Sequence, residues 1–522
     1  MKNTESNTQT LTTTNANALR DGEHQSPWQA NVSIAEDTAK ELHTSYDVLI
    51  VGAGITGITA ALMLQKAGKQ CIVSDSYTPG FGTTGGTSAH INTFADTTYA
   101  EAESAFGKEG AQLFADAVNE GFNIIKDNVN LYKIDCDYET KTGFVYAETD
   151  DEVKQLDDIY TGTQKVGVSI SYAENVPTPV EIKKAVALPN QAQFHPLKYL
   201  QAIQEQFIKL GGIVVNYTQI KKIEQSGGLF KVTTNNNPIT ARAVIYATHM
   251  PPGINLFNLR CAPYRSYVLG VKLTDDKYPE ALVYDMQEPY HYLRTHEIDG
   301  QKLLIVGGND HKTGHEDAEK AFEDLEKYVR KYYNVSSVKY KWSSQYYVSV
   351  DGFPYIGQMP SEPKGVYCAT GYNGNGMMLG SISAKILSDL IIGNDSKYQK
   401  IFSPARIKPI DGFTEFVKEN ADAAYHFVAD RFNIHETDSL KRLKPDSGNV
   451  VEVNGQKIAA YRDSAGKIHA LSPVCTHAKC IVNWNQEEKS WDCPCHGARY
   501  DINGEVLTGP ARKELQQINL EE

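Results

Sequence analysis

The sequence has 522 residues, of which 41% are hydrophobic and 22% charged, an ordinary composition for a globular protein with room for roughly two to four structural units. The formal net charge is −13 and the pI is near 5.6, which argues against nucleic acid as a partner. Four of the eight cysteines are scattered along the chain, so the sequence is not that of a disulfide scaffold.

The first 45 residues are polar, and we expect this N-terminal extension to be partly disordered. It has no apolar core of the kind that a signal peptide needs. The rest of the chain has no run of about eighteen apolar residues, so we expect no transmembrane segment. These features predict a cytoplasmic protein.

The folded region begins with a strand–turn–helix–strand pattern, over residues 46–51, 52–57, 58–67 and 71–74. The turn contains Gly52, Gly54 and Gly57, and Asp75 ends the second strand. The first glycine allows a tight turn, the second lets the backbone approach a pyrophosphate, and the third brings the helix against the strand. Asp75 is suitably spaced to bind a ribose hydroxyl, so the pattern favours a dinucleotide site over an accidental glycine turn.

Two further segments complete the predicted cofactor site. The loop at 79–90 can follow a cofactor through Thr83, Thr84, Thr87 and Ser88. A strand over 366–371 then leads into a glycine-rich helix start that includes Gly371, Asn373, Gly374, Gly376 and Met377. The positive end of this helix suits a flavin carbonyl that gains negative charge on reduction. A second nucleotide site is the alternative, although no second strand ending in an acid follows.

These segments resemble the FAD-dependent amine and D-amino-acid oxidase superfamily over roughly residues 46–395, together with Ala241–Thr248 and Asp351–Gly357. The resemblance implies FAD, with Thr248 beside it. It also implies a Rossmann-like FAD-binding domain interleaved with an antiparallel-sheet substrate domain, in the α/β and α+β classes. The FAD-binding parts are expected at about 46–100, 180–255 and 340–395. The chain departs from the family pattern at Asp75, where Glu is commoner, and at His249, where Gly is usual.

The substrate domain should contain strands at 264–273, 281–284, 291–295 and 302–306, in a sheet over the flavin. In relatives such a sheet carries an Arg or Tyr that holds the substrate carboxylate, which implies Arg294 and Tyr292 as substrate-binding residues. Alternation puts Tyr290, Tyr292 and Arg294 on one face of their strand. A solvated or paired arginine is the alternative reading. We assign no catalytic base, because positioning does most of the work in this superfamily.

A connecting arm is expected over residues 396–435, with an amphipathic helix at 412–432, before a C-terminal module at 436–522. The module contains two boxes, C-x-H with Cys475 and His477, and C-x-x-H with Cys493 and His496. Two thiolates can hold one iron of a [2Fe–2S] cluster and two imidazoles the other. A zinc knuckle and a plain disulfide pair are the alternatives, but zinc sites usually show other spacings.

Residues 471–511 resemble the cluster-binding region of Rieske proteins of the respiratory and photosynthetic type. The resemblance implies an all-β domain, the four ligands just named, and a disulfide between Cys480 and Cys495. Ala498 stands where high-potential members have a serine that donates to a cluster sulfide, whereas Tyr500 is kept. Since such donors stabilise the reduced cluster, we expect a potential below that of respiratory relatives.

The two parts together resemble bacterial glycine/D-amino-acid-oxidase-like proteins with a C-terminal Rieske domain. A flavin takes two electrons as a hydride, whereas a [2Fe–2S] cluster takes one. We therefore expect oxidation of an amine or amino-acid-like substrate, with electrons leaving singly through the cluster to a protein or quinone. The alternatives are an NAD(P)H-dependent reductase, a Rieske oxygenase, for which no second iron site is evident, and a non-catalytic redox sensor or electron-transfer protein.

Overall fold

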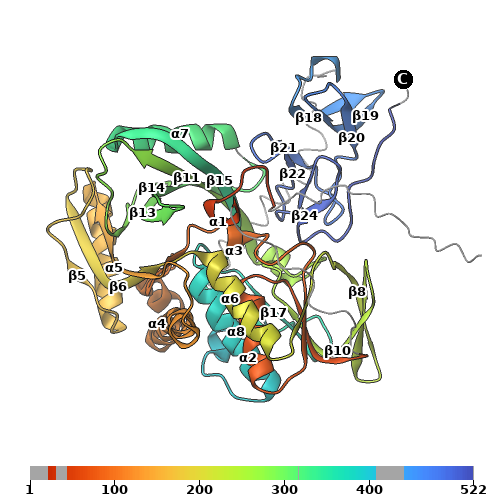
Figure 1. Ribbon diagram of the computed structural model, residues 1–522, viewed down its shortest axis with the longest axis horizontal. Helices are drawn as coiled ribbons and strands as arrows, with labels where there is room; N and C mark the ends of the chain where they lie inside the picture. The colour runs from red at the N-terminus through yellow and green to blue at the C-terminus, as the bar shows by residue number, and fades with distance from the viewer. Residues whose placement is uncertain (1–20, 31–43, 316, 407–439, 521–522) are drawn as a thin grey trace, which may run out of the picture.

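The computed structural model describes residues 21–30, 44–315, 317–406 and 440–520, arranged as in Figure 1. The expected helix at 412–432, most of the connecting arm and the first 20 residues lie outside this range. We refer to residues 44–406 as the large domain and to residues 440–520 as the C-terminal domain. Within the described ranges, no helix is long and apolar enough to cross a membrane.

The first sheet of the large domain is mostly parallel, and its central strand β1 (Tyr46–Val51) pairs in parallel with β2 and β10. Its strands run in the order β16–β17–β10–β1–β2–β7, with β8 and β9 continuing beside β10. Their bounds are β2 (Cys71–Ser74), β7 (Ile213–Val215), β8 (Ile220–Ser226), β9 (Leu229–Thr234), β10 (Ile239–Tyr246), β16 (Tyr355–Gln358) and β17 (Val366–Thr370). The continuous apolar runs of β1 and β2 suit strands buried on both faces.

Three helices pack together beside this sheet, as Figure 1 shows: α2 (Ile55–Lys66), α6 (Pro196–Lys209) and α8 (Gly376–Ile392). The long α4 (Tyr99–Tyr132) packs on α8 and bends at Gly107, where the backbone leaves helical geometry. A capping box of Thr98 and Glu101 starts α4, because the two side chains satisfy the first free amides. The shorter helices are α3 (Thr83–Gly86), η1 (Leu256–Leu259) and α9 (Gln399–Phe402).

The second sheet of the large domain is mostly antiparallel and runs β15–β11–β14–β13–β12–β4–β6–β3, with β5 beside β6. Its strands are β3 (His90–Ile91), β4 (Glu139–Ala147), β5 (Ser171–Tyr172), β6 (Lys184–Gln193), β11 (Cys261–Leu273), β12 (Leu282–Tyr284), β13 (His291–Ile298), β14 (Gln301–Lys312) and β15 (Val335–Ser349). Helix α7 (Ala318–Tyr332) packs on β11 and β14, and α5 (Asp150–Lys165) on β4 and β6. The expected pairing of a Rossmann-like domain with an antiparallel-sheet domain is confirmed.

The C-terminal domain is built from two small antiparallel sheets, which confirms its expected all-β class. After η2 (Leu440–Arg442), the first sheet contains β18 (Ser447–Val453), β19 (Gln456–Arg462) and β20 (Ile468–Leu471). The second contains β21 (Asn483–Asn485), β22 (Ser490–Asp492), β23 (Arg499–Tyr500) and β24 (Val506–Thr508). The Cys/His boxes lie in the loops that follow β20 and β22.

Residues 21–30 of the N-terminal extension, which include the short α1 (Pro27–Ala30), pack against both domains. Trp28 is fully buried and its indole N–H donates to the Thr87 carbonyl at 2.7 Å. At the other end of the segment, the carboxylate of Asp21 lies 3.1 Å from the guanidinium of Arg499 in the C-terminal domain. This segment therefore joins the cofactor-loop region to the C-terminal domain.

The two domains share a buried charged contact. Arg265 on β11 and Glu488 of the C-terminal domain lie 3.4 Å apart, with side chains 1% and 0% exposed. Ser343 on β15 links them, since its hydroxyl accepts from Arg265 Nε at 2.6 Å and its amide donates to Glu488 at 3.1 Å. A buried pair of this kind fixes one docking geometry, because any displacement leaves a charge without its partner.

We expect Glu488→Ala to destabilise the docked protein by about 3 kcal/mol or more, because Arg265 would keep its buried charge without a counter-ion. The measurement is the shift of the first thermal unfolding transition. Lys154→Ala is the matched control, since it breaks a solvent-exposed pair with Asp151 that is worth about 0–1 kcal/mol. Equal shifts for the two variants would contradict the assignment of Arg265–Glu488 as the contact that fixes docking.

Candidate functional site

A cavity of about 590 Å³ lies where the two sheets of the large domain and the C-terminal domain meet. Its wall includes the glycine turn after β1, the loop around α3, the start of α8 and the face of the antiparallel sheet. The C-terminal domain contributes residues Val506–Gly509, Ala511 and Arg512. Segments far apart in the sequence therefore enclose one space.

The glycine turn is packed as the dinucleotide pattern requires. A Cβ added to Gly57 would lie 1.9 Å from the Gly52 carbonyl oxygen, and one added to Gly52 would lie 2.6 Å from the Ala247 carbonyl oxygen. Gly54 and Ile55 line the cavity, so the N-terminal end of α2 faces it. The amides of Ala53 and Ile55 donate to Asp75 at 2.7 Å and to the Thr84 hydroxyl at 3.1 Å, so the turn is held closely and the positive end of α2 is directed at the cavity.

Asp75 lies at the end of β2 and lines the same cavity. Its two carboxylate oxygens accept from the amides of Ala53 at 2.7 Å and Tyr77 at 2.9 Å. Burial raises the pKa of this carboxyl, and the two amide bonds partly offset that effect. The remaining lone pairs of a carboxylate held in this way suit ribose hydroxyls.

Most of the residues predicted to bind the cofactor line the cavity: Gly52, Gly54, Asp75, Thr83, Thr84, Thr87, Ser88, Thr248, Asn373, Gly374, Gly376 and Met377. Gly57 and Gly371 do not. Gly57 packs against Gly52, and Gly371, with φ of +75°, packs against Ser349 and Cys261. These two glycines support the cavity wall from behind. The lining as a whole fits a dinucleotide.

The structure separates the two predicted substrate-binding residues. Tyr292 lines the cavity, and its hydroxyl lies 3.0 Å from that of Ser266. Arg294 does not line it. Its fully buried guanidinium donates to the carbonyls of Ala89 at 3.1 Å and Phe194 at 3.3 Å, over the ring of Trp28.

The expectation that Arg294 binds the substrate therefore needs correction. Alternation does put Tyr292 and Arg294 on one face, but residues two apart on a strand are separated by roughly 7 Å. That distance carries Arg294 beyond the cavity wall, to backbone carbonyls that need donors. Polar cavity residues that were not predicted from the sequence include Asp96, Asp310 and Tyr346, and His249, noted above only as a departure from the family pattern, also lines the cavity. Alternation along β14 could have pointed to Asp310.

The second site lies in the loops of the C-terminal domain. Cys475 and Cys493 are free and fully buried, and the rings of His477 and His496 lie 5.0 Å apart at 87°. Both ring nitrogens of His477, and Nδ1 of His496, have no hydrogen-bond partner in the part of the chain described. Two cysteines and two histidines that converge with unsatisfied ligand atoms fit a [2Fe–2S] cluster.

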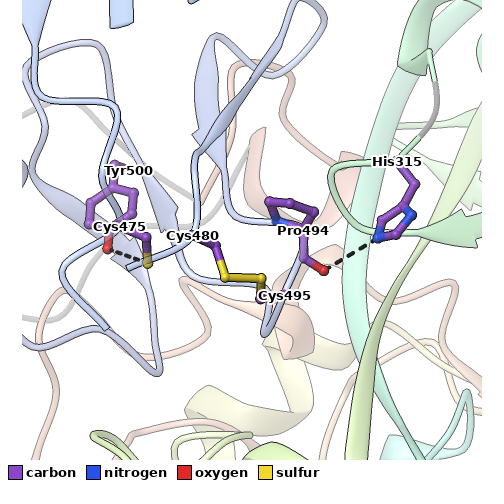
Figure 2. The surroundings of a disulfide bond; sticks show 6 residues. All are labelled: His315, Cys475, Cys480, Pro494, Cys495 and Tyr500. Carbon is purple, nitrogen blue, oxygen red and sulfur yellow. Dashed lines mark hydrogen bonds between the residues drawn. A yellow bond between two sulfur atoms is a disulfide. The ribbon is translucent and has the colours of Figure 1, made fainter. Parts of the chain in front are cut away.

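The surroundings of Cys475 favour its thiolate. Hydrogen bonds from Cys493, Tyr500 and backbone amides lower the pKa of the Cys475 thiol to about 6. The Tyr500 hydroxyl lies 3.2 Å from Cys475 Sγ, as Figure 2 shows. Cys480 and Cys495 form the expected disulfide, with Cα atoms 6.5 Å apart, which joins the two ligand loops.

The histidine side of this second site faces the large domain. Tyr347 on β15 is fully buried, and its hydroxyl donates to the backbone carbonyls of His496 at 3.4 Å and Gly509 at 3.3 Å. The ring of His249, which lines the cavity, lies 4.9 Å from the ring of Tyr347. His477 lies beside the Gly253 backbone, which donates to Pro510 at 2.8 Å. The cavity and the Cys/His site are thus separated by a thin, closely packed wall.

Comparisons with known proteins match both parts of the chain. The family model of FAD dependent oxidoreductases, DAO, matches residues 47–390, and that of the Rieske [2Fe-2S] domain matches residues 433–519. A Rieske 2Fe-2S iron-sulfur protein of Bacillus subtilis (strain 168), YhfW, is 33% identical over 95% of this chain and 97% of its own length. These matches confirm the predicted cofactors, FAD and a [2Fe–2S] cluster.

More distant similarity extends over the large domain. The gamma-glutamylputrescine oxidoreductase of Escherichia coli (strain K12) is 22% identical over 78% of this chain and 97% of its own length. The crystal structure of glycine oxidase from Geobacillus kaustophilus aligns with a TM-score of 0.58 at 18% identity, covering 70% of this chain and 99% of that chain. At this identity the similarity shows the fold alone.

We expect Gly57→Ala to weaken FAD binding at least about tenfold, because the added methyl group must push α2 away from Gly52, at a cost of about 1–3 kcal/mol. The measurement is the FAD content of the purified protein and its rate of FAD release. Thr59→Ala, a change at a buried position of the same helix, should retain the cofactor. An unchanged FAD content in Gly57→Ala would refute the packing argument.

We expect Ala498→Ser to raise the midpoint potential of the cluster by about 60 mV, the one-electron equivalent of about 1.4 kcal/mol, which is within the range of one ordinary hydrogen bond. Ala498 is fully buried, and its carbonyl accepts from the Cys493 amide at 2.8 Å. Redox titration monitored by EPR measures the change. Ala470→Ser, at a buried position on β20, is the control and should leave the potential unchanged. A potential that stays constant or falls in Ala498→Ser would contradict the role given to this position.

Proposed function

The chain belongs to the DAO family of FAD-dependent oxidoreductases and carries a Rieske [2Fe-2S] domain at its C-terminal side, and from this premise we propose its reaction. It oxidises an amine or amino-acid-like small molecule at FAD, and the electrons leave one at a time through the cluster to an external acceptor. The acceptor is a protein or a quinone.

The residues that hold the two groups are those that line their sites. Gly52, Gly54 and Asp75 would hold the dinucleotide part of FAD, and Gly376 at the start of α8 would contribute to the flavin part of the site. Cys475, Cys493, His477 and His496 would hold the cluster. When bound, FAD supplies a hydride acceptor and the cluster a one-electron carrier. The protein contributes orientation of the substrate and exclusion of water.

The observation that carries the proposal is the contact between the two sites. His496 and His477 face Tyr347 and Gly253 of the large domain, and His249 on the other side of Tyr347 lines the cofactor cavity. These contacts, from the His249 ring to the Tyr347 ring and from the Tyr347 hydroxyl to the His496 carbonyl, support transfer between the two groups within one chain. Oxygen can reoxidise a reduced flavin directly, so a cluster at this position favours dehydrogenase-type turnover.

The substrate class is supported by the relatives. One is a gamma-glutamylputrescine oxidoreductase and another a glycine oxidase, so both are named for substrates with an amine nitrogen. The antiparallel sheet with Tyr292 faces the cavity, in the position expected for substrate binding.

The test is an anaerobic panel of amines, amino acids and hydroxy acids, read by flavin bleaching and by the EPR signal of the reduced cluster. We expect an amine-containing substrate to bleach the flavin and to generate the cluster signal in the same molecule. Cys493→Ser removes a cluster ligand. We expect the substrate to reduce the flavin of this variant as before. We expect the variant to reduce a one-electron acceptor protein at least about tenfold more slowly than the unaltered enzyme.

Cys136→Ser is the matched control, because Cys136 is a buried cysteine outside both sites. It should keep flavin, cluster and acceptor reduction. A fully bleached flavin beside a permanently oxidised cluster would contradict electron flow between them. If NADH bleaches the flavin and none of the amines does, the NAD(P)H-dependent reductase is favoured instead.

A further inference from the structure

We infer that the substrate end of the cavity binds the ammonium group of an amine that has no carboxylate beside its reacting carbon, with Asp310 as the counter-ion within a ring of tyrosines. The inference rests on the proposed amine oxidation and narrows its substrate class. It differs from the amino-acid type of substrate, whose carboxylate is held most strongly by a cationic group.

Asp310 on β14 is the central residue. Its Oδ2 accepts from the Tyr346 hydroxyl at 2.7 Å, whereas Oδ1 is buried and has no hydrogen-bond partner among the residues described. Burial raises the pKa of this carboxyl to about 7, although the Ser266 and Tyr346 hydroxyls oppose the effect. A buried carboxylate with an unsatisfied oxygen is costly, and a cationic donor is the ligand that would relieve this cost.

Aromatic side chains surround the same space. The cavity wall includes Tyr284, Tyr290, Tyr292 and Tyr346. The rings of Tyr290 and Tyr292 lie 5.9 Å apart, and His90 lies 5.4 Å from both Tyr284 and Tyr292. Tyrosine faces attract an ammonium group through their quadrupole, most strongly where water is excluded.

A second cavity, of about 540 Å³, adjoins the first and shares Asp96, Tyr290, Asp310 and Tyr346 with it. It also shares the acidic Glu288 with the first cavity, and its wall adds Glu101 and Asp351, of which Asp351 is paired with Arg406 at 2.6 Å. No lysine or arginine belongs to this wall among the described residues. A cavity lined by one sign of charge concentrates ligands of the opposite sign, so it favours the approach of a cation.

Counting described residues, the walls of the two cavities contain few cationic side chains that could pair with a substrate carboxylate. Arg512 is the one lysine or arginine in the wall of the first cavity, counting described residues, and its guanidinium donates to the Pro252 carbonyl at 2.7 Å. Burial lowers the pKa of His90 to about 3 and that of His249 to about 4, so both are neutral at pH 7. Arg294, the predicted carboxylate clamp, binds backbone carbonyls instead.

The test compares two ligands of one shape on the holoenzyme, tert-butylammonium and pivalate. Neither has a hydrogen on the carbon next to its charged group, so neither is oxidised and binding is measured without turnover. Isothermal titration calorimetry and perturbation of the flavin absorbance give the two affinities. We expect tert-butylammonium to bind at least tenfold more tightly than pivalate. Equal affinities, tighter pivalate binding or no ammonium binding would overturn the inference.

Asp310→Asn tests the counter-ion with a nearly isosteric change. We expect the affinity for tert-butylammonium to fall at least tenfold, and Asp150→Asn, at an exposed position on α5, to leave it unchanged. An unchanged affinity in Asp310→Asn would overturn the role of Asp310. If this variant fails to hold FAD, the comparison of the two ligands on the unaltered enzyme decides the question.

Turnover separates this inference from the proposed function. The anaerobic enzyme is given pairs of compounds. Each pair consists of an amino acid and the amine that has the same side chain but lacks the carboxylate. If tert-butylammonium binds but no compound bleaches the flavin, the proposed function is wrong and the inferred ammonium site stands. If the amino acids bleach the flavin faster than the amines, the inferred preference for amines is wrong and the proposed function stands.

Discussion

The buried contact between Arg265 and Glu488 is the constraint on which the arrangement of this protein depends. Two charges without solvent access tolerate little displacement, so the C-terminal domain has one stable position on the large domain. That position closes the cavity with residues 506–512 and brings the histidine side of the cluster site against Tyr347. Removing the contact would thus affect both the enclosure of the cofactor cavity and the packing between the cavity and the cluster site.

The large cavity has two chemically different regions. Toward α2 it offers the positive end of the helix and the carboxylate of Asp75, which suit the phosphates and ribose of a dinucleotide. Toward the antiparallel sheet it offers carboxylates and tyrosine rings, with the pKa of Asp310 raised by burial. The first region follows from the fold, whereas the second depends on individual side chains of the antiparallel sheet.

Motifs with local geometry were predictable from the sequence, and long-range neighbours were not. The glycine turn, Asp75 and the two Cys/His boxes each place their residues through a few consecutive bonds, so their spacing was informative. The prediction that Arg294 binds the substrate failed because the position of this side chain depends on where β13 lies relative to Ala89 and Phe194, which are far away in sequence. Asp310 was overlooked because its significance comes from Tyr346 and Tyr290, which meet it only after folding.

Asp21 and Arg499 meet although nearly the whole chain separates them, and Trp28 anchors the same segment in the large domain. If the C-terminal domain alone were transferred to another protein, Arg499 would keep its contact with Asp492 but lose its contact with Asp21. The C-terminal domain and residues 21–30 therefore form one structural unit, although they lie at opposite ends of the polypeptide.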